Sequence, residues 1–219
     1  LAAVGSAFSL MTFLTSILLG LAMGSGTVFS IRFGQKDHQG LKEGILASFA
    51  LLGLVTVLLN VLVFAGIDWI IAILQTPASL VSLMREYLIV IFCGLAGIFL
   101  YNFFASLLRS LGNSVVPLLF LAVSAGLNIL LDLWFVAGLN RGVAGAAEAT
   151  VLSQYVSGIG IAIYTKVKFP QLLRREPGVR LRWSRVKEIT SFSSLTCLQQ
   201  SIMNLGILAV QGLVNSFGT

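Results

Sequence analysis

Six long apolar runs divide this chain, and their length constrains its fold more than any other feature. We place them at about residues 3–31, 43–74, 85–111, 115–138, 143–165 and 189–217. A helix needs about 20 mostly apolar residues to cross the hydrocarbon core of a bilayer. Of the 219 residues, 57% are hydrophobic and only 10% are charged, far below the charge of a soluble domain. The runs therefore predict an all-α, polytopic membrane protein with six transmembrane helices.

The basic residues of the loops predict the orientation of these helices. The loops after the first, third and fifth runs carry twelve of the 14 lysines and arginines, whereas the other two loops carry only Arg85 and Arg141. Because loops rich in Lys and Arg stay in the cytoplasm, the fifth loop is predicted to be cytoplasmic and Leu1 to lie at the outer face. The net charge of +6 follows from these loops and does not indicate nucleic-acid binding.

The fifth loop, residues 166–188, has the composition of a linker between two helical bundles. It contains eight cationic residues, Pro170 and Pro177, and apolar residues between the cations. One interpretation is an amphipathic segment that lies on the inner leaflet. The other is a solvated basic loop that serves only to fix the topology.

Small residues in the first run have the spacing of a helix-packing motif. Gly20 and Gly24 form a G-x-x-x-G sequence, and Gly26 follows. In lipid, small residues let two helix backbones approach closely. We interpret this stretch as a packing surface, with a hinge as the alternative.

Asp132 lies deep inside the fourth run, where a carboxylate is unexpected. An ionisable side chain in hydrocarbon is costly and by default marks an ion or substrate path. Asn128 is four residues away and therefore shares a helix face with Asp132. On the fifth run, Thr150 and Gln154 have the same spacing. The alternative is a structural acid, held by hydrogen bonds to neighbouring helices.

The short connection at about 138–143 predicts that the fourth and fifth runs form an antiparallel hairpin. Asp132 lies six residues before this connection and Thr150 seven residues after it. At 1.5 Å per residue, both are roughly 9–10 Å below the outer end. This counting places Asp132 level with Thr150, and Asn128 level with Gln154. Asp132, Asn128 and Thr150 together would bind a small cation, because carboxylate, amide and hydroxyl oxygens are hard ligands.

Other polar residues of the spans are candidates for lining a cavity. Glu148 is ionisable but points roughly 200° away from Thr150 around the helix. Amides in spanning helices usually serve in hydrogen bonds between helices, and that alternative stays open here. The full set of cavity candidates is Gln154, Glu148, Tyr101, Asn102, Gln199, Gln200 and Asn204.

Several segments together resemble the multidrug and toxic compound extrusion (MATE) family. Residues 109–117 are similar to its R-x-x-G-x-x-x-x-P turn, and 128–132 to its N-x-x-x-D helix. Residues 142–150 resemble its G-V-x-G-A-A-x-A-T segment, with Glu148 where the family usually has an apolar residue. The segments 1–7 and 32–37 fit as well, so the similarity covers essentially the whole chain in the right order.

The resemblance implies two six-helix bundles, related by a pseudo-two-fold axis, that work by alternating access. Residues 1–165 would be the second to sixth helices of the first bundle, 166–188 the cytoplasmic linker, and 189–219 the first helix of the second bundle. The family also has an acidic residue on its first helix, which has no counterpart here. We therefore expect the chain to be part of a longer protein, monomeric when complete, that does not transport without its other part.

The resemblance also implies which residues bind the coupling ion, because the first-bundle cation site of the family maps onto Asn128, Asp132 and Thr150. The function predicted is a cation-coupled efflux antiporter of the plasma membrane. It would use Na⁺ or H⁺ to export drugs or other small organic, often cationic, compounds, with no cofactor and no metal beyond Na⁺.

Three other functions fit the sequence less well than the antiporter. A flippase of lipid-linked saccharides, from the same superfamily, would favour Lys or Arg along the central cavity, and no run has one at mid-span. A membrane-embedded enzyme is not indicated, because the sequence has no H-E-x-x-H, no G-x-S-x-G and no paired intramembrane aspartates. A purely structural subunit would not need an acid in hydrocarbon.

Overall fold

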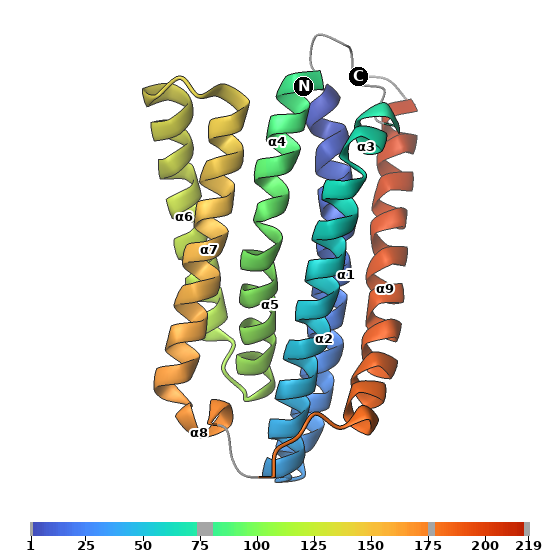
Figure 1. The fold of residues 1–219 in the computed structure, drawn as a ribbon, viewed down its shortest axis with the longest axis vertical. Helices are drawn as coiled ribbons and strands as arrows, with labels where there is room; N and C mark the ends of the chain where they lie inside the picture. The colour runs from blue at the N-terminus through green and yellow to red at the C-terminus, as the bar shows by residue number, and fades with distance from the viewer. Residues whose placement is uncertain (1, 74–80, 175–177, 217–219) are drawn as a thin grey trace.

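The computed structural model describes residues 2–73, 81–174 and 178–216, and these ranges are almost entirely helical (Figure 1). No β-strand occurs in them. The long helices run side by side, and α8 lies at one end of the array. The elements in chain order are α1 (Ala2–Gly34), α2 (His38–Ala65), α3 (Ile67–Ile73), α4 (Val81–Cys93), α5 (Leu95–Ser110), α6 (Val115–Asp132), the π-helical η2 (Leu133–Gly138), α7 (Gly142–Lys168), α8 (Pro170–Leu173) and α9 (Trp183–Ser216).

Four stretches of the described chain are long and apolar enough to cross a membrane, namely Met11–Gly34, His38–Ala65, Val81–Ser110 and Val115–Gly138. The other two predicted spans correspond to α7 and α9, which have 27 and 34 residues and lie alongside the four (Figure 1). Both are more polar, because α7 contains Glu148 and Gln154 and α9 begins with a charged turn. The chain is an all-α, multi-pass membrane protein.

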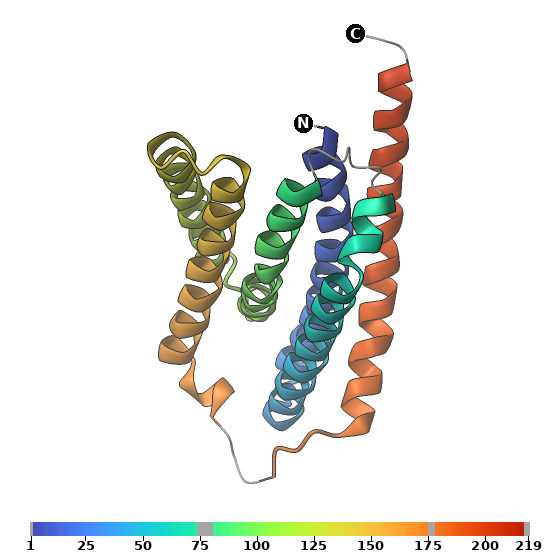
Figure 2. The same cartoon turned by 45° about the horizontal axis from the view of Figure 1, so that its top comes forward.

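The helices form three groups, which Figure 2 separates: α6 with α7, α4 with α5, and α1 and α2 with α9. The arm formed by α6 and η2 is the least covered of the four apolar spans, since only 6% of its most apolar stretch is buried. Leu118 and Leu130 on α6 are each 65% exposed. Lipid tails are as apolar as leucine, so these side chains gain little from burial and suit a surface that faces hydrocarbon.

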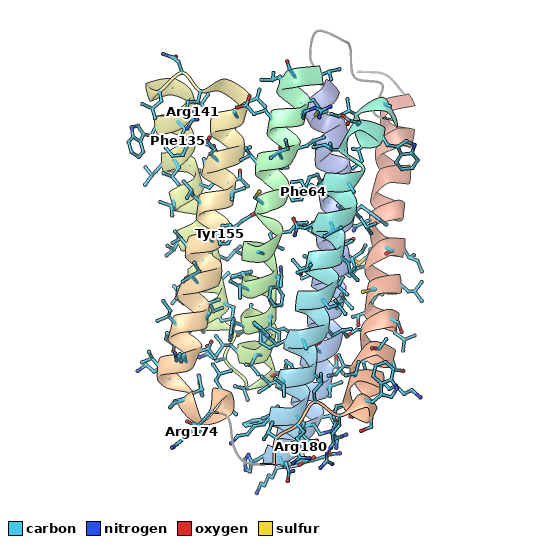
Figure 3. All side chains as sticks on the ribbon, in the orientation of Figure 1. Phe64, Phe135, Arg141, Tyr155, Arg174 and Arg180 are labelled. Atoms are coloured by element: carbon cyan, nitrogen blue, oxygen red, sulfur yellow. The ribbon has the colours of Figure 1, made fainter. Side chains whose placement is uncertain are left out.

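Two of the predicted runs are each split into two helices, at Gly66 and at Gly94. Gly94 permits a close approach, because a Cβ atom there would lie 2.4 Å from Oε1 of Gln154. The Tyr155 hydroxyl donates a hydrogen bond of 2.9 Å to the carbonyl oxygen of Cys93, just before the break (Figure 3). Such bonds from a neighbouring helix make an interruption tolerable in lipid.

The glycines of the first run pack α1 against α9, as their spacing predicted. A Cβ atom on Gly24 would lie 2.4 Å from Cα of Ser193, and one on Gly20 would lie 2.8 Å from Cα of Cys197. The Ser193 hydroxyl donates to the carbonyl oxygen of Leu21 at 3.1 Å. Backbone therefore meets backbone along this pair of helices, which leaves no room for larger residues.

Replacing Gly24 by alanine is expected to push α1 and α9 apart and to lower stability by about 1–3 kcal/mol. The matched control is Gly126→Ala on α6, where a new Cβ has no heavy atom within 4 Å. The free energy of unfolding of the control variant should rise by up to about 1 kcal/mol, because alanine is a better helix former than glycine. Thermal unfolding of the complete protein in detergent measures both, and equal melting temperatures would contradict the packing described.

A cluster of ion pairs joins α1, α2 and α9 at the end of the helix array where α8 also lies. Glu43 is only 1% exposed and forms ion pairs with Nε of Arg182 and Nε of Arg185, each at 3.2 Å. Of the two, Nε of Arg185 also donates a hydrogen bond to Oε2 of Glu43. Arg185 also reaches Glu188 at 3.1 Å, and Glu188 in turn pairs with Arg32 at 2.6 Å. Burial disfavours the guanidinium, yet the hydrogen bonds to Glu188 and Glu43 hold the pKa of Arg185 above its usual value. The last part of the basic loop therefore does more than fix topology, because it binds α2 and α1.

Glu43→Gln is expected to lower the free energy of unfolding by roughly 1–3 kcal/mol, since two arginines lose a charged acceptor. Glu86→Gln on α4 is the control, because Glu86 is exposed and a surface change of this kind is usually worth less than about 0.5 kcal/mol. Both variants of the complete protein would be compared by thermal unfolding. A Glu43 variant as stable as the control would show that the cluster adds nothing to stability.

Candidate cation site

Asp132 is the last residue of α6, directly before the six-residue π-helical segment η2. Its side chain is half-buried, and its Oδ1 atom is buried without a hydrogen-bond partner in the described part of the chain. Arg141, the basic residue of the adjacent outer loop, pairs with Glu148 instead, at 2.7 Å from Nη1 to Oε2. Figure 3 shows Arg141 at the connected end of the α6–α7 hairpin. Asp132 is thus an acid whose buried oxygen is left to accept a proton or a cation.

The structure brings Asn128 and Thr150 together across the hairpin. Nδ2 of Asn128 donates to Oγ1 of Thr150 at 3.4 Å, and this hydroxyl donates to the carbonyl oxygen of Ala146 at 2.9 Å. Next to this pair, the Ser124 hydroxyl donates to the carbonyl oxygen of Ser153 at 3.0 Å. Because the amide nitrogen of Asn128 is used, its amide oxygen is the atom that remains for a ligand.

The predicted register of the hairpin was wrong by about one helical turn. Counting placed Asp132 level with Thr150, but Asn128 occupies that level. One contribution comes from η2, in which the N–H of Leu139 donates to the carbonyl oxygen of Trp134, five residues back, at 2.9 Å. A π-helix winds more residues into each turn, so it climbs less than the α-helix that the counting assumed. Asp132 therefore lies one turn nearer the outer end than the Asn128–Thr150 pair.

Two other candidates lie away from this pair. Oε1 of Gln154 is buried, has no hydrogen-bond partner in the described residues and lies against Gly94 at the α4–α5 break, rather than beside Asn128. Glu148 is held in its ion pair with Arg141. Neither residue therefore adds an oxygen next to Thr150 in this arrangement.

A small polar cavity of about 200 Å³ lies between α1, α5 and α9. Three of the cavity candidates line it, namely Asn102, Gln200 and Asn204. Of the remaining two, Gln199 is exposed, and Tyr101 donates to the carbonyl oxygen of Pro117 at 3.0 Å and so ties α5 to α6. Sequence reasoning missed the other polar residues of this cavity, although their spacing of three and four residues on one helix was a signal: Thr12, Thr15 and Ser16.

Comparison with known proteins places the chain in a family. The MatE family model matches residues 1–134, and the chain belongs to this family. It is 32% identical to the probable multidrug resistance protein YpnP of Bacillus subtilis (strain 168) over 93% of this chain and 45% of that protein. It is also 32% identical to the multidrug export protein MepA of Staphylococcus aureus (strain NCTC 8325 / PS 47), over 73% of this chain and 36% of that protein. The chain spans about half the length, or less, of the curated relatives it matches.

Solved structures show the same fold. An outward-facing MATE transporter superposes with a TM-score of 0.86 at 27% identity, over 95% of this chain and 46% of that one. A MOP superfamily transporter from Pyrococcus furiosus, whose binding pocket of reverse polarity suggests a different function, superposes with a TM-score of 0.86 at 27% identity. This superposition also covers 95% of this chain and 46% of that one. The fold is therefore shared by proteins with different pockets, so the substrate has to be argued from side chains.

The register of the hairpin predicts which cysteine pairs can be cross-linked. In the complete protein without its native cysteines, Asn128→Cys with Thr150→Cys should react readily with a short bifunctional thiol reagent. Asp132→Cys with Thr150→Cys should react much more slowly, because these positions are one turn apart along the hairpin. Mass spectrometry of the cross-linked peptide measures both yields, and the reverse order would restore the register predicted by counting.

Proposed function

We propose that the complete protein is a cation-coupled efflux antiporter that exports organic, often cationic, compounds by alternating access. The observation that carries the proposal is the buried Oδ1 of Asp132, which lacks a partner in the described chain. An acid at this depth is expensive unless it binds something. The names of the relatives, which include a multidrug export protein, support an exported organic substrate.

The residues around Asp132 fit either coupling ion by their chemistry. A proton needs only the carboxylate of Asp132. Na⁺ prefers several oxygen ligands, and the Asn128 amide and the Thr150 hydroxyl offer two more on the same side of the hairpin. The site lies in the outer half of the hairpin, so an inward gradient of either ion would load it from outside.

The position of the cation would couple ion binding to the conformational change that exports the substrate. Binding shifts a conformational equilibrium only if the ion has a different affinity for the two states. Asp132 sits at the junction of α6 and η2, where a cation would also neutralise the costly charge. A state that exposes Asp132 to the outside would be favoured when the ion binds, and release toward the cytoplasm would complete the exchange for substrate.

Asp132→Asn in the complete protein should abolish gradient-driven efflux, because an amide neither carries the charge nor takes up the proton. The assay is transport in membrane vesicles with Na⁺ and H⁺ gradients imposed separately, so the effective gradient also identifies the coupling ion. Asp68→Asn is the matched control, since Asp68 is an exposed acid at the outer end that pairs with Arg85. Normal efflux by the Asp132 variant would make Asp132 a structural residue and end the proposal.

A further inference from the structure

We propose that a cavity at the cytoplasmic end of the chain binds one anionic phospholipid of the inner leaflet. The cavity has a volume of about 700 Å³ and lies between α2, α5, α8 and residues 179–181. Its size is in the range of sites that enclose a ligand of drug size. It is remote from Asp132, which does not line it, and it has no part in the proposed cation exchange.

The inner wall of the cavity is apolar and rigid. Phe103 packs edge to face against Phe49 and against Phe104, with ring centroids 5.2 Å and 5.1 Å apart respectively. Leu172 and Leu173 of α8 face these rings across the cavity. Aromatic pairs in this geometry hold their positions, so the wall is a preformed surface for hydrocarbon.

The cavity opens toward the surrounding lipid on one side. Leu46 and Phe49 both line it, and each is 41% exposed on the apolar face of α2. An acyl chain can therefore enter from the bilayer without crossing water. A water-soluble ligand would gain nothing from this opening.

Cations surround the other side of the cavity. Lys42, Arg174 and Arg180 line it, and Figure 3 shows both arginines at the lower end of the molecule, which is the predicted cytoplasmic end. None of the described lining residues is acidic. The nearby Glu43 is turned away into its ion pairs with Arg182. Arginine binds phosphate with paired N–H donors, so this side suits a phosphate group.

The two halves together select the chemistry of the ligand. A phosphate beside the cations and an acyl chain against the phenylalanines are the two parts of an anionic phospholipid, and basic pockets between spanning helices on the cytoplasmic side recognise such headgroups. An organic cation would meet the positive charges and be repelled. The lipid would join α2 and α5 to the segment that connects α7 with α9.

The test compares lipid binding by the complete protein and by two matched double variants. Binding of phosphatidylglycerol and of phosphatidylcholine is measured by native mass spectrometry. The variant Arg174→Gln with Arg180→Gln should bind phosphatidylglycerol roughly 30-fold more weakly, at about 5-fold for each cation near the membrane surface. The control is Lys166→Gln with Lys168→Gln, which removes the same charge from the same end but outside the cavity. It should keep most of the affinity.

The possible outcomes distinguish lipid binding in the cavity from a general attraction of anionic lipid to the basic surface. Equal losses in the two double variants would mean that the basic surface, not the cavity, attracts the lipid, and would overturn the proposal. Displacement of the lipid by millimolar inorganic phosphate would show a site for free phosphate, which also overturns it. If phosphatidylcholine binds as tightly as phosphatidylglycerol, the cavity does not select an anionic headgroup, and the proposal is also overturned.

A second measurement leaves the arginines in place, in case the double variant does not fold. A photo-reactive benzoylphenylalanine at Leu46 should cross-link to phosphatidylglycerol in mixed vesicles well above its share of the lipid. The same probe at Leu118 on exposed α6 is the reference for random contact with lipid. If the probe at Leu46 samples the lipids in the same proportions as the probe at Leu118, the cavity does not select an anionic lipid.

Discussion

Polar atoms inside a bilayer have no water to bond with, and this constraint governs most of what the structure shows. Hydroxyls in the spans turn back to their own helix, as Thr56 does to the carbonyl oxygen of Leu52 at 2.7 Å. Ser106 instead reaches the carbonyl oxygen of Ala22 on α1, at 2.6 Å, and so joins two helices. Against this background, a buried carboxylate oxygen without a partner is a departure from the rule. Asp132 stands out because an acid costs more to bury unpartnered than an amide or a hydroxyl.

The sequence was sufficient for the features that depend on hydropathy and on close packing. Runs of apolar residues predicted the spans, and the Gly20–Gly24 spacing predicted a packing surface, which the structure places against α9. Counting along the hairpin put Asn128 and Thr150 in one polar cluster, but it placed Asp132 rather than Asn128 level with Thr150. The cytoplasmic position of the basic loops follows from charge alone and stays a prediction, because no membrane accompanies the structure.

Features that depend on local backbone geometry were not predictable in this way. The π-helical η2 has no sequence marker, since its residues are as apolar as those of α6, and it contributed to the shift of the hairpin register. The break at Gly94 depends on how near Gln154 comes from another helix. The pairing of Glu43 with Arg182 and Arg185 joins residues about 140 positions apart, and only the assembled helices bring them together.

The helices differ in how firmly they are held, and this difference bears on the proposed exchange. Close backbone contact and a cluster of ion pairs fix α1, α2 and α9 to one another. The α6–η2 hairpin arm contacts mainly α7, and most of its surface faces outward. A cation at Asp132 would therefore act on the least constrained part of the described chain.

The two possible coupling ions make different demands on that hairpin. A proton is satisfied by the carboxylate of Asp132 where it stands. Na⁺ needs several oxygens at once, and the amide and hydroxyl oxygens of Asn128 and Thr150 lie one turn deeper. Drawing them onto one ion would require η2 and the end of α6 to move together toward α7. In the proposed mechanism, Na⁺ would therefore drive a movement of this hairpin, whereas H⁺ would act chiefly by removing a charge from hydrocarbon.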